Sequence, residues 1–276
     1  MTRTYRTHRM SAAARTPAAP YRRTGPVRAV AAVGAAAVLV AGLAGCGASA
    51  ADDTEPERRT FALAGDTLTV DSHDAGLEIV AADGHASGKI RVTRWFRGRV
   101  VVGSDPKVTW SMKDDRLVLR LTCSGIIADC AARHRVEVPR GIAVTVRERD
   151  GGVRAGGFQD PLSIRTGDGS VHVTDTSGPL ELHSGDGSVR AEVSSRTVRT
   201  RSGDGSVRLE LRAVPDRVES HSGDGSVTIE LPRAAYRVDT RTGDGPERVS
   251  VPRDDASRHV VKARTGDGSL TVRTVN

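Results

Sequence analysis

From about residue 141 to the C-terminus, apolar and polar residues alternate in short runs. In the segment 188–193, Val189, Ala191 and Val193 alternate with Arg190 and Glu192. A period of two residues is that of a β-strand with one buried face. After a short break the alternation resumes at 198–201, and it returns in the next copy at 207–211. Each repeat is therefore predicted to contain two short strands and two bends.

A five-residue phrase with Gly-Asp-Gly at its centre separates these strands and occurs six times. Its copies begin at Thr166, Ser184, Ser202, Ser222, Thr242 and Thr265. Their aspartates, at steps of 18, 18, 20, 20 and 23 residues, are Asp168, Asp186, Asp204, Asp224, Asp244 and Asp267. A fixed phrase at this period is typical of stacked repeats, and it is too short for a propeller blade of roughly 40 residues. The sequence predicts an all-β fold, a parallel β-solenoid with two-strand coils of about 18–20 residues.

The phrase itself is predicted to be a structural corner. Glycine tolerates positive φ, and an aspartate can bond its own downstream amide. A calcium site is disfavoured, because calcium-binding solenoids repeat every nine residues and calcium takes six to eight oxygen ligands. One copy departs from the pattern: Pro246 replaces the serine, and Glu247 stands where other copies have Val or Leu. This coil is expected to be irregular, either a bulge or a local edge.

The phrase has a degenerate forerunner that sets the domain boundaries. Asp150-Gly151-Gly152-Val153 lies 18 residues before Asp168, so repeats are predicted over 141–276. Residues 60–140 alternate without the corner phrase and are predicted to form a β-rich cap that protects the first rung from edge-to-edge pairing. The chain is expected to end on a strand at 270–275, without a capping helix.

The first 45 residues have the order of a secretory signal peptide. A basic stretch ends at Arg28, an apolar run covers 29–44, and Leu43-Ala44-Gly45-Cys46 follows. The last four residues resemble the lipobox of bacterial lipoproteins, which implies cleavage before Cys46 and a lipid on its thiol. The alternative is an ordinary signal peptide with a chance cysteine. Arg22-Arg23 leaves general secretory or twin-arginine export open, and Met10 is an alternative start.

The predicted address is the outer face of the cell membrane, with the membrane as a partner through the lipid on Cys46. Two acyl chains would give stable anchoring. Residues 46–59 are polar and aperiodic and are predicted to be a flexible tether. Cys123 and Cys130 remain as a pair; in an exported protein a disulfide is the simplest prediction, with a metal or redox pair as the alternative.

The net charge of +7 does not indicate a nucleic-acid partner. The seven arginines of residues 1–45 account for the whole excess of 41 basic over 34 acidic residues, and that segment has no Asp or Glu. The remainder is formally neutral, so net charge predicts no polyanion-binding surface, although a local basic stripe remains possible.

Stacking would place the residue before each phrase in a row. That row is predicted to comprise Arg165, His183, Arg201, His221, Arg241 and Arg264. Beside it would run the aspartate row, and the two rows are expected to neutralise one another in part. The row is a possible binding ladder. It predicts no zinc site, because Arg201 separates His183 from His221 by ~10 Å in all. We predict no metal, no cofactor and no catalysis, because every coil repeats the same residues whereas an active site is one exceptional place.

A lipobox, a β-rich first part and a run of Ser-Gly-Asp-Gly-Ser-Val coils resemble the bacterial "putative adhesin" family of β-strand-repeat proteins, a domain of unknown function. The resemblance covers about residues 60–276 and implies an envelope protein with a parallel β-solenoid, but it carries over no functional residues. We expect a lipid-anchored, non-catalytic binding or scaffold module whose partner is a cell-wall polymer or an envelope protein. An envelope stress or signalling accessory and a carbohydrate-active β-helix enzyme are the alternatives.

Overall fold

The computed structural model describes residues 49–83 and 88–275, so the predicted signal peptide and Cys46 lie outside the described residues. No helix within the described ranges is long and apolar enough to cross a membrane. One 3₁₀ turn, η1 (Ala50–Asp52), precedes an all-β chain. The strands are β1 (Glu57–Ala62), β2 (Thr67–His73), β3 (Gly76–Ala82), β4 (Lys89–Lys113), β5 (Arg116–Pro139), β6 (Ala143–Glu148), β7 (Val153–Gly156), β8 (Leu162–Thr166), β9 (Val171–Thr174), β10 (Leu180–Ser184), β11 (Val189–Val193), β12 (Thr197–Ser202), β13 (Val207–Leu211), β14 (Arg217–Ser222), β15 (Val227–Leu231), β16 (Arg237–Arg241), β17 (Glu247–Ser250), β18 (Val260–Arg264) and β19 (Leu270–Thr274).

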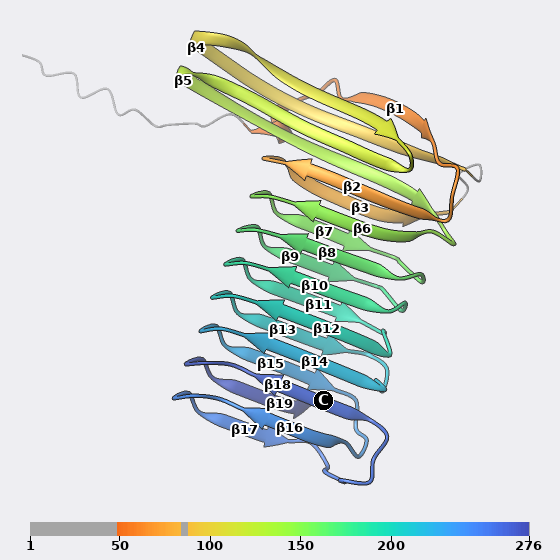
Figure 1. Cartoon of the computed structure of the whole chain (residues 1–276), viewed down its shortest axis with the longest axis vertical. Helices are drawn as coiled ribbons and strands as arrows, with labels where there is room; N and C mark the ends of the chain where they lie inside the picture. The colour runs from red at the N-terminus through yellow and green to blue at the C-terminus, as the bar shows by residue number, and fades with distance from the viewer. Residues whose placement is uncertain (1–48, 84–87, 276) are drawn as a thin grey trace, which may run out of the picture. The chain divides into compact units, whose positions relative to one another are not determined.

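The strands form two parallel ladders, which confirms the predicted parallel β-solenoid (Figure 1). Ladder A runs in the order β2, β6, β8, β10, β12, β14, β18 and β16. Ladder B runs in the order β3, β7, β9, β11, β13, β15, β19 and β17. Each coil gives one strand to each ladder.

The core lies between the two ladders and consists of stacked aliphatic rows. Val198 pairs with Val218, and Leu209 pairs with Ile229, all of them fully buried. Like residues therefore stack on like residues at the ~4.8 Å spacing of neighbouring strands. A register shift of one residue would expose every one of these side chains, so the alternating pattern fixes the register.

The corner phrase works differently from the sequence prediction. No corner glycine has positive φ; the described glycines that do are Gly88, Gly103, Gly141 and Gly157. Glycine is needed instead because the backbones of neighbouring corners lie close together. A Cβ added to Gly205 would lie 2.2 Å from the carbonyl oxygen of Gly187. The phrase is therefore a stacking device, in which the absence of a side chain lets one coil lie on the next.

The hydroxyl at the first position of the phrase completes this stacking. Ser184 Oγ donates to the carbonyl of Gly169 at 3.0 Å, and Ser202 Oγ donates to that of Gly187 at 3.2 Å. The copies at Ser222, Thr242 and Thr265 make the same contact with the adjacent coil, at 2.9, 3.1 and 2.7 Å. Each buried hydroxyl thus satisfies a carbonyl of its neighbour, a role that the sequence analysis did not assign.

The order of coils at the C-terminal end differs from the order in the sequence. The last strands, β18 and β19, lie between the β14–β15 coil and the β16–β17 coil, so β16 and β17 form the end of the stack (Figure 1). The expected sequential stack was wrong here. Polarity gives the reason: Val261, Ala263 and Val272 are fully buried, whereas Glu247 and Arg248 are exposed. The apolar coil takes the interior, and the coil with Pro246 takes the edge.

At the other end, the stack is covered by β4 and β5. The β2–β3 coil lacks the corner phrase but pairs with β6 and β7 like any other coil. On its far side, residues 116–120 of β5 pair with β2, and residues 133–139 pair with β3. Strand β4 pairs antiparallel along β5, and β1 pairs antiparallel with β4. This hairpin closes the first rung with antiparallel strands.

Both long strands double back on themselves at their middle. Cys123 and Cys130 both belong to β5 and are joined by a disulfide with Cα atoms 6.2 Å apart. Seven residues of straight strand would span about 23 Å, so β5 must reverse between them. Register shifts in the β4–β5 pairing fall between Val100 and Lys107, at the matching place in β4. The reversal forms a doubled tip.

Candidate binding face

The outward side of ladder A carries a row of cations. Arg165 pairs in register with His183, His183 with Arg201, and Arg201 with His221. The row continues through Arg264 to Arg241, in that order, because β18 is inserted before β16. Arg147 on β6 extends it at the other end. We call these residues the cation row: Arg147, Arg165, His183, Arg201, His221, Arg264 and Arg241.

A second outward row, one position nearer the other bend, alternates in charge. It consists of Ser163, Glu181, Arg199, Glu219, Lys262 and Asp239. Its acids partly neutralise nearby arginines: Arg165 reaches Glu181 at 3.2 Å, and Arg199 reaches Glu219 at 3.0 Å. The guanidinium groups of Arg217 and Arg199 hold the pKa of Glu219 below its usual value, so this acid is ionised at neutral pH.

The corner aspartates do not neutralise the cation row, contrary to expectation. In the described part of the chain, none of the six forms an ion pair or accepts a hydrogen bond through its carboxylate. All six are exposed. The expected Asp turn to its own amide is therefore absent as well. Upstream in the same line, desolvation and the neighbouring carboxylate of Asp74 raise the pKa of Asp150.

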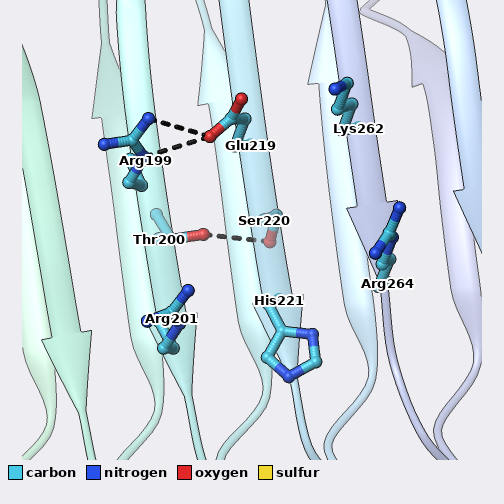
Figure 2. Close-up of a pocket in the computed structure, with 8 residues that line it drawn as sticks. All are labelled: Arg199, Thr200, Arg201, Glu219, Ser220, His221, Lys262 and Arg264. Atoms are coloured by element: carbon cyan, nitrogen blue, oxygen red, sulfur yellow. Dashed lines mark hydrogen bonds and ion pairs between the residues drawn. The ribbon is translucent and has the colours of Figure 1, made fainter.

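Two cations of ladder A remain without an ion-pair partner among the described residues. Figure 2 shows Arg201 and Lys262 beside the paired Arg199 and Glu219. The row's imidazoles, His183 and His221, lie on either side of Arg201. Arg264 contacts Asp239 only at 3.7 Å. This part of the face therefore presents uncompensated positive charge.

The same residues line an open groove of about 500 Å³, whose walls include Arg199, Arg201, His221, Lys262 and Arg264. A smaller hollow of about 130 Å³ adjoins it between Arg165 and Arg201. A third, of about 310 Å³, shares Arg199 and lies over the start of the ladder, where hydroxyl and proline side chains replace the cations. Its walls include Thr69, Thr145, Ser163, Pro161 and Pro179. The three hollows form one track across successive coils.

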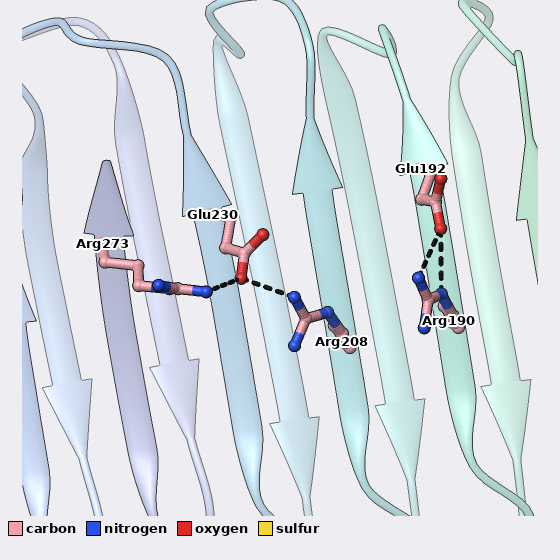
Figure 3. Close-up of polar contacts among 5 residues, drawn as sticks. All are labelled: Arg190, Glu192, Arg208, Glu230 and Arg273. Carbon is pink, nitrogen blue, oxygen red and sulfur yellow. Dashed lines mark hydrogen bonds and ion pairs between the residues drawn. The ribbon is translucent and has the colours of Figure 1, made fainter. Parts of the chain in front are cut away.

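Ladder B differs, because its charges are mutually paired. Figure 3 shows Arg190 on Glu192 of the same strand, at 2.7 Å. It also shows Glu230 between Arg208, at 2.8 Å, and Arg273. Glu230 is only 5% exposed and is satisfied by two arginines. The pKa of Glu192 is lowered by its contact with Arg190. Ladder B is a neutralised surface, and ladder A is the cationic one.

Sequence reasoning found the six residues that precede each phrase but missed three groups that shape the groove. Arg147 could have been found by its 18-residue distance from Arg165. Arg199 and Lys262 stand two residues before the row residues Arg201 and Arg264, so they share its outward face. No group of three or more His, Cys, Asp or Glu side chains in the described segments is arranged to hold a metal ion.

Comparisons with known proteins agree on architecture. The Toastrack DUF4097 family model matches residues 136–275. A putative adhesin from Bacteroides fragilis is 12% identical, with a TM-score of 0.48, and the match covers 80% of this chain and 98% of that one. A putative adhesin from Parabacteroides merdae is 11% identical, with a TM-score of 0.46 over 81% and 97% of the two chains. A putative lipid binding protein from Parabacteroides distasonis is 10% identical, with a TM-score of 0.46 over 81% and 98%. No curated protein matches.

Proposed function

Because the chain belongs to the Toastrack DUF4097 family, whose name assigns no chemistry, we propose a function from its own surface: a non-catalytic binding module that holds an extended anionic polymer along ladder A. The observation that carries this proposal is the contrast between the two ladders. Unpaired cations lie on ladder A at Arg201 and Lys262, whereas the arginines around Glu230 and Glu192 on ladder B are paired.

A repeating ligand suits this surface because the cation row repeats once per coil. Neighbouring strands lie ~4.8 Å apart, so a polymer laid across the strands would meet a cation or an imidazole at every coil. The track also passes over hydroxyl groups, at Thr69, Thr145 and Ser163. A cell-wall polymer that combines anionic groups with sugar hydroxyls offers matching chemistry along such a track.

The absence of a single exceptional residue supports a non-catalytic role. The cations of the groove recur at equivalent positions of successive coils, and their acids serve as ion-pair partners. Within the described residues, the perturbed groups His134 and Glu148 lie in the cap and the first coils, away from the walls of the groove. A carbohydrate-active enzyme would concentrate such groups in the groove.

For the cellular address we propose export and lipid anchoring at Cys46, on the basis of the basic, apolar and small-residue order of residues 1–46. Replacement of Cys46 by serine should release the protein into the medium. Retention of this variant in the membrane fraction at wild-type levels would contradict the anchor.

The binding proposal is tested by co-sedimentation of residues 47–276 with isolated cell-wall sacculi across a salt series. This segment contains every described strand and the whole described core. Binding should saturate and should weaken as salt rises, because exposed charges are screened over about 10 Å at 0.1 M. The R201Q/K262Q double variant should bind about tenfold more weakly at low salt, with a shallower salt dependence.

A matched control removes the same charge from the other ladder. Arg154 and Arg248 are exposed on ladder B and form no ion pair in the described structure. R154Q/R248Q should bind like wild type if the face matters, and should fall as far as R201Q/K262Q if only net charge matters. Saturable binding unaffected by either pair would reject ladder A as the site. Failure of the wild type to bind would favour the alternative of an envelope accessory with a protein partner.

A further inference from the structure

The apex of the doubled β4–β5 tip is an exposed apolar cluster. We use "apex" for residues 98–105 of β4 and 124–129 of β5. Among the described residues, four large hydrophobic side chains are exposed, and three of them lie here: Val101 at 61%, Val102 at 53% and Ile126 at 83%. The fourth, Val275 at 37%, is near the C-terminus. Single exposed apolar residues are ordinary, but a cluster on a projecting element is typical of an interaction site.

The apex projects beyond the corner that it covers. In the coil beneath, only Asp74 and Ala75 separate β2 from β3. In β5, residues 121–132 stand between the positions that pair with His73 and Gly76. Half of that excursion outward and half back, at ~3.3 Å per residue, carries the apex roughly 15–20 Å past the corner. Figure 1 shows this doubled tip at the β4 and β5 labels.

The apex is built to hold its shape. The disulfide between Cys123 and Cys130 closes the base of the β5 turn. Gly103 and Gly125 pair across the two strands, and a Cβ on Gly125 would lie 2.5 Å from the carbonyl oxygen of Val102. The two strands are therefore nested closely at their turning point. A tip of this construction presents its valines and isoleucine outward without a partner to bury them.

The N-terminal end of the described chain runs toward this apex. Strand β1 is antiparallel to β4, with Glu57 opposite Arg94, so the chain before Glu57 follows β4 toward Phe96. Asp53 accepts a hydrogen bond from the Phe96 amide at 2.9 Å, and η1 packs against both β4 and β5. Cys46 stands three residues before Ser49, which is at most ~10 Å of extended chain. An anchor at Cys46 would therefore hold the apex close to the membrane surface.

We propose that the apex of the β4–β5 tip, through Val101, Val102 and Ile126, contacts the lipid bilayer to which Cys46 anchors the chain. This rests on the proposed anchor for its geometry. Burial of apolar side chains at the acyl boundary is favourable, and a second contact beside the lipid fixes the orientation of the molecule. The stack of coils then extends from the membrane with ladder A accessible from the side.

The test places a tryptophan at the apex and supplies the tether artificially. Residues 47–276 with an N-terminal histidine tag are bound to vesicles of phosphatidylethanolamine, phosphatidylglycerol and a nickel-chelating lipid, with or without brominated acyl chains. Ile126→Trp is the apex probe and Val275→Trp the matched control, and the wild type gives the background of Trp95 and Trp110. The added fluorescence of I126W should be quenched about twofold or more by brominated lipid, and that of V275W should not change.

Serine substitution then tests the apolar character of the contact. V101S/V102S in the I126W background should reduce the quenching severalfold, while thermal melting stays at the value of I126W. Equal quenching of I126W and V275W, or quenching unaffected by the two serines, would overturn the proposal. Because the tag replaces the lipid, this outcome is independent of whether Cys46→Ser releases the protein in cells, so the two proposals can fail separately.

Discussion

The buried imidazole of His134 should make the folded state lose stability in acid. His134 lies on β5, opposite Arg94 of β4 and Leu77 of β3, and is 0% exposed. Neither ring nitrogen has a hydrogen-bond partner in the described structure. Burial and, to a lesser degree, the positive charge of Arg94 lower the pKa of His134 from 6.5 to about 4.

The direction of the pH effect follows from proton binding. Above pH 6.5 the imidazole is neutral in both states and contributes no pH dependence. Between pH 6.5 and about 4 the unfolded chain binds a proton that the folded chain does not, so stability falls as pH falls through this window and levels off below it. One pKa unit corresponds to about 1.4 kcal/mol, so the loss reaches about 3 kcal/mol at pH 4.

Replacement of His134 by leucine isolates this contribution. Urea unfolding of residues 47–276, followed by the fluorescence of Trp95 and Trp110, gives the free energy of unfolding at pH 7.5 and pH 4. Wild type should lose about 3 kcal/mol more than H134L over this interval, because all other titrating groups are common to both proteins. At pH 7.5, H134L should be at least as stable, since two unsatisfied buried nitrogens are removed. Parallel pH profiles for the two proteins would refute the reasoning.

Three further predictions concern the stacking of the coils. Gly205→Ala should cost about 3 kcal/mol or more by urea unfolding, because its Cβ would meet the Gly187 carbonyl at 2.2 Å; Gly152→Ala, whose nearest contact is 3.6 Å, should change stability by less than about 1 kcal/mol, and equal losses would contradict the close-approach argument. Ser202→Ala should cost about 1 kcal/mol through its lost hydrogen bond to Gly187, whereas the exposed Ser206→Ala should cost nothing measurable. P246S/E247V, which gives the terminal coil the regular pattern, should promote concentration-dependent association in sedimentation velocity, while a monomer at every concentration would show that Pro246 and Glu247 do not protect the edge.

Much of the repeat could be predicted because its physics is local. Alternation over five residues fixes which side chains face inward, and the recurring phrase fixes where each coil turns. Together they predicted that Arg165, His183 and Arg201 stand side by side, as their strand pairing places them. The period alone also gave the two-strand coil and its stacking direction.

The remaining features depend on comparisons between distant segments. The insertion of β18 and β19 follows from the competition between two coils for the interior, which the apolar Val261 and Val272 win over Glu247 and Arg248. Alternation cannot show that β4 and β5 double back, because straight and reversed strands have the same period. The close spacing of Cys123 and Cys130 was the available signal. The partners of Arg199 and Arg165 were missed because attention stayed on the aspartates.

The division of labour within the repeat also indicates where binding specificity resides. In each phrase the first hydroxyl satisfies a carbonyl of the next coil, and the second glycine leaves room for that coil's backbone. Both tasks are identical in every coil, so the phrase is repeated for stacking and carries no information about a ligand. The outward positions of ladder A are free of that constraint, and they change from coil to coil: hydroxyls and prolines at one end, unpaired cations at the other. A ligand that reads this gradient must lie along the stack in one direction, with its anionic part over Arg201 and Lys262. Substitution at these variable positions should alter binding without unfolding the stack, whereas substitution in the phrase should do the reverse.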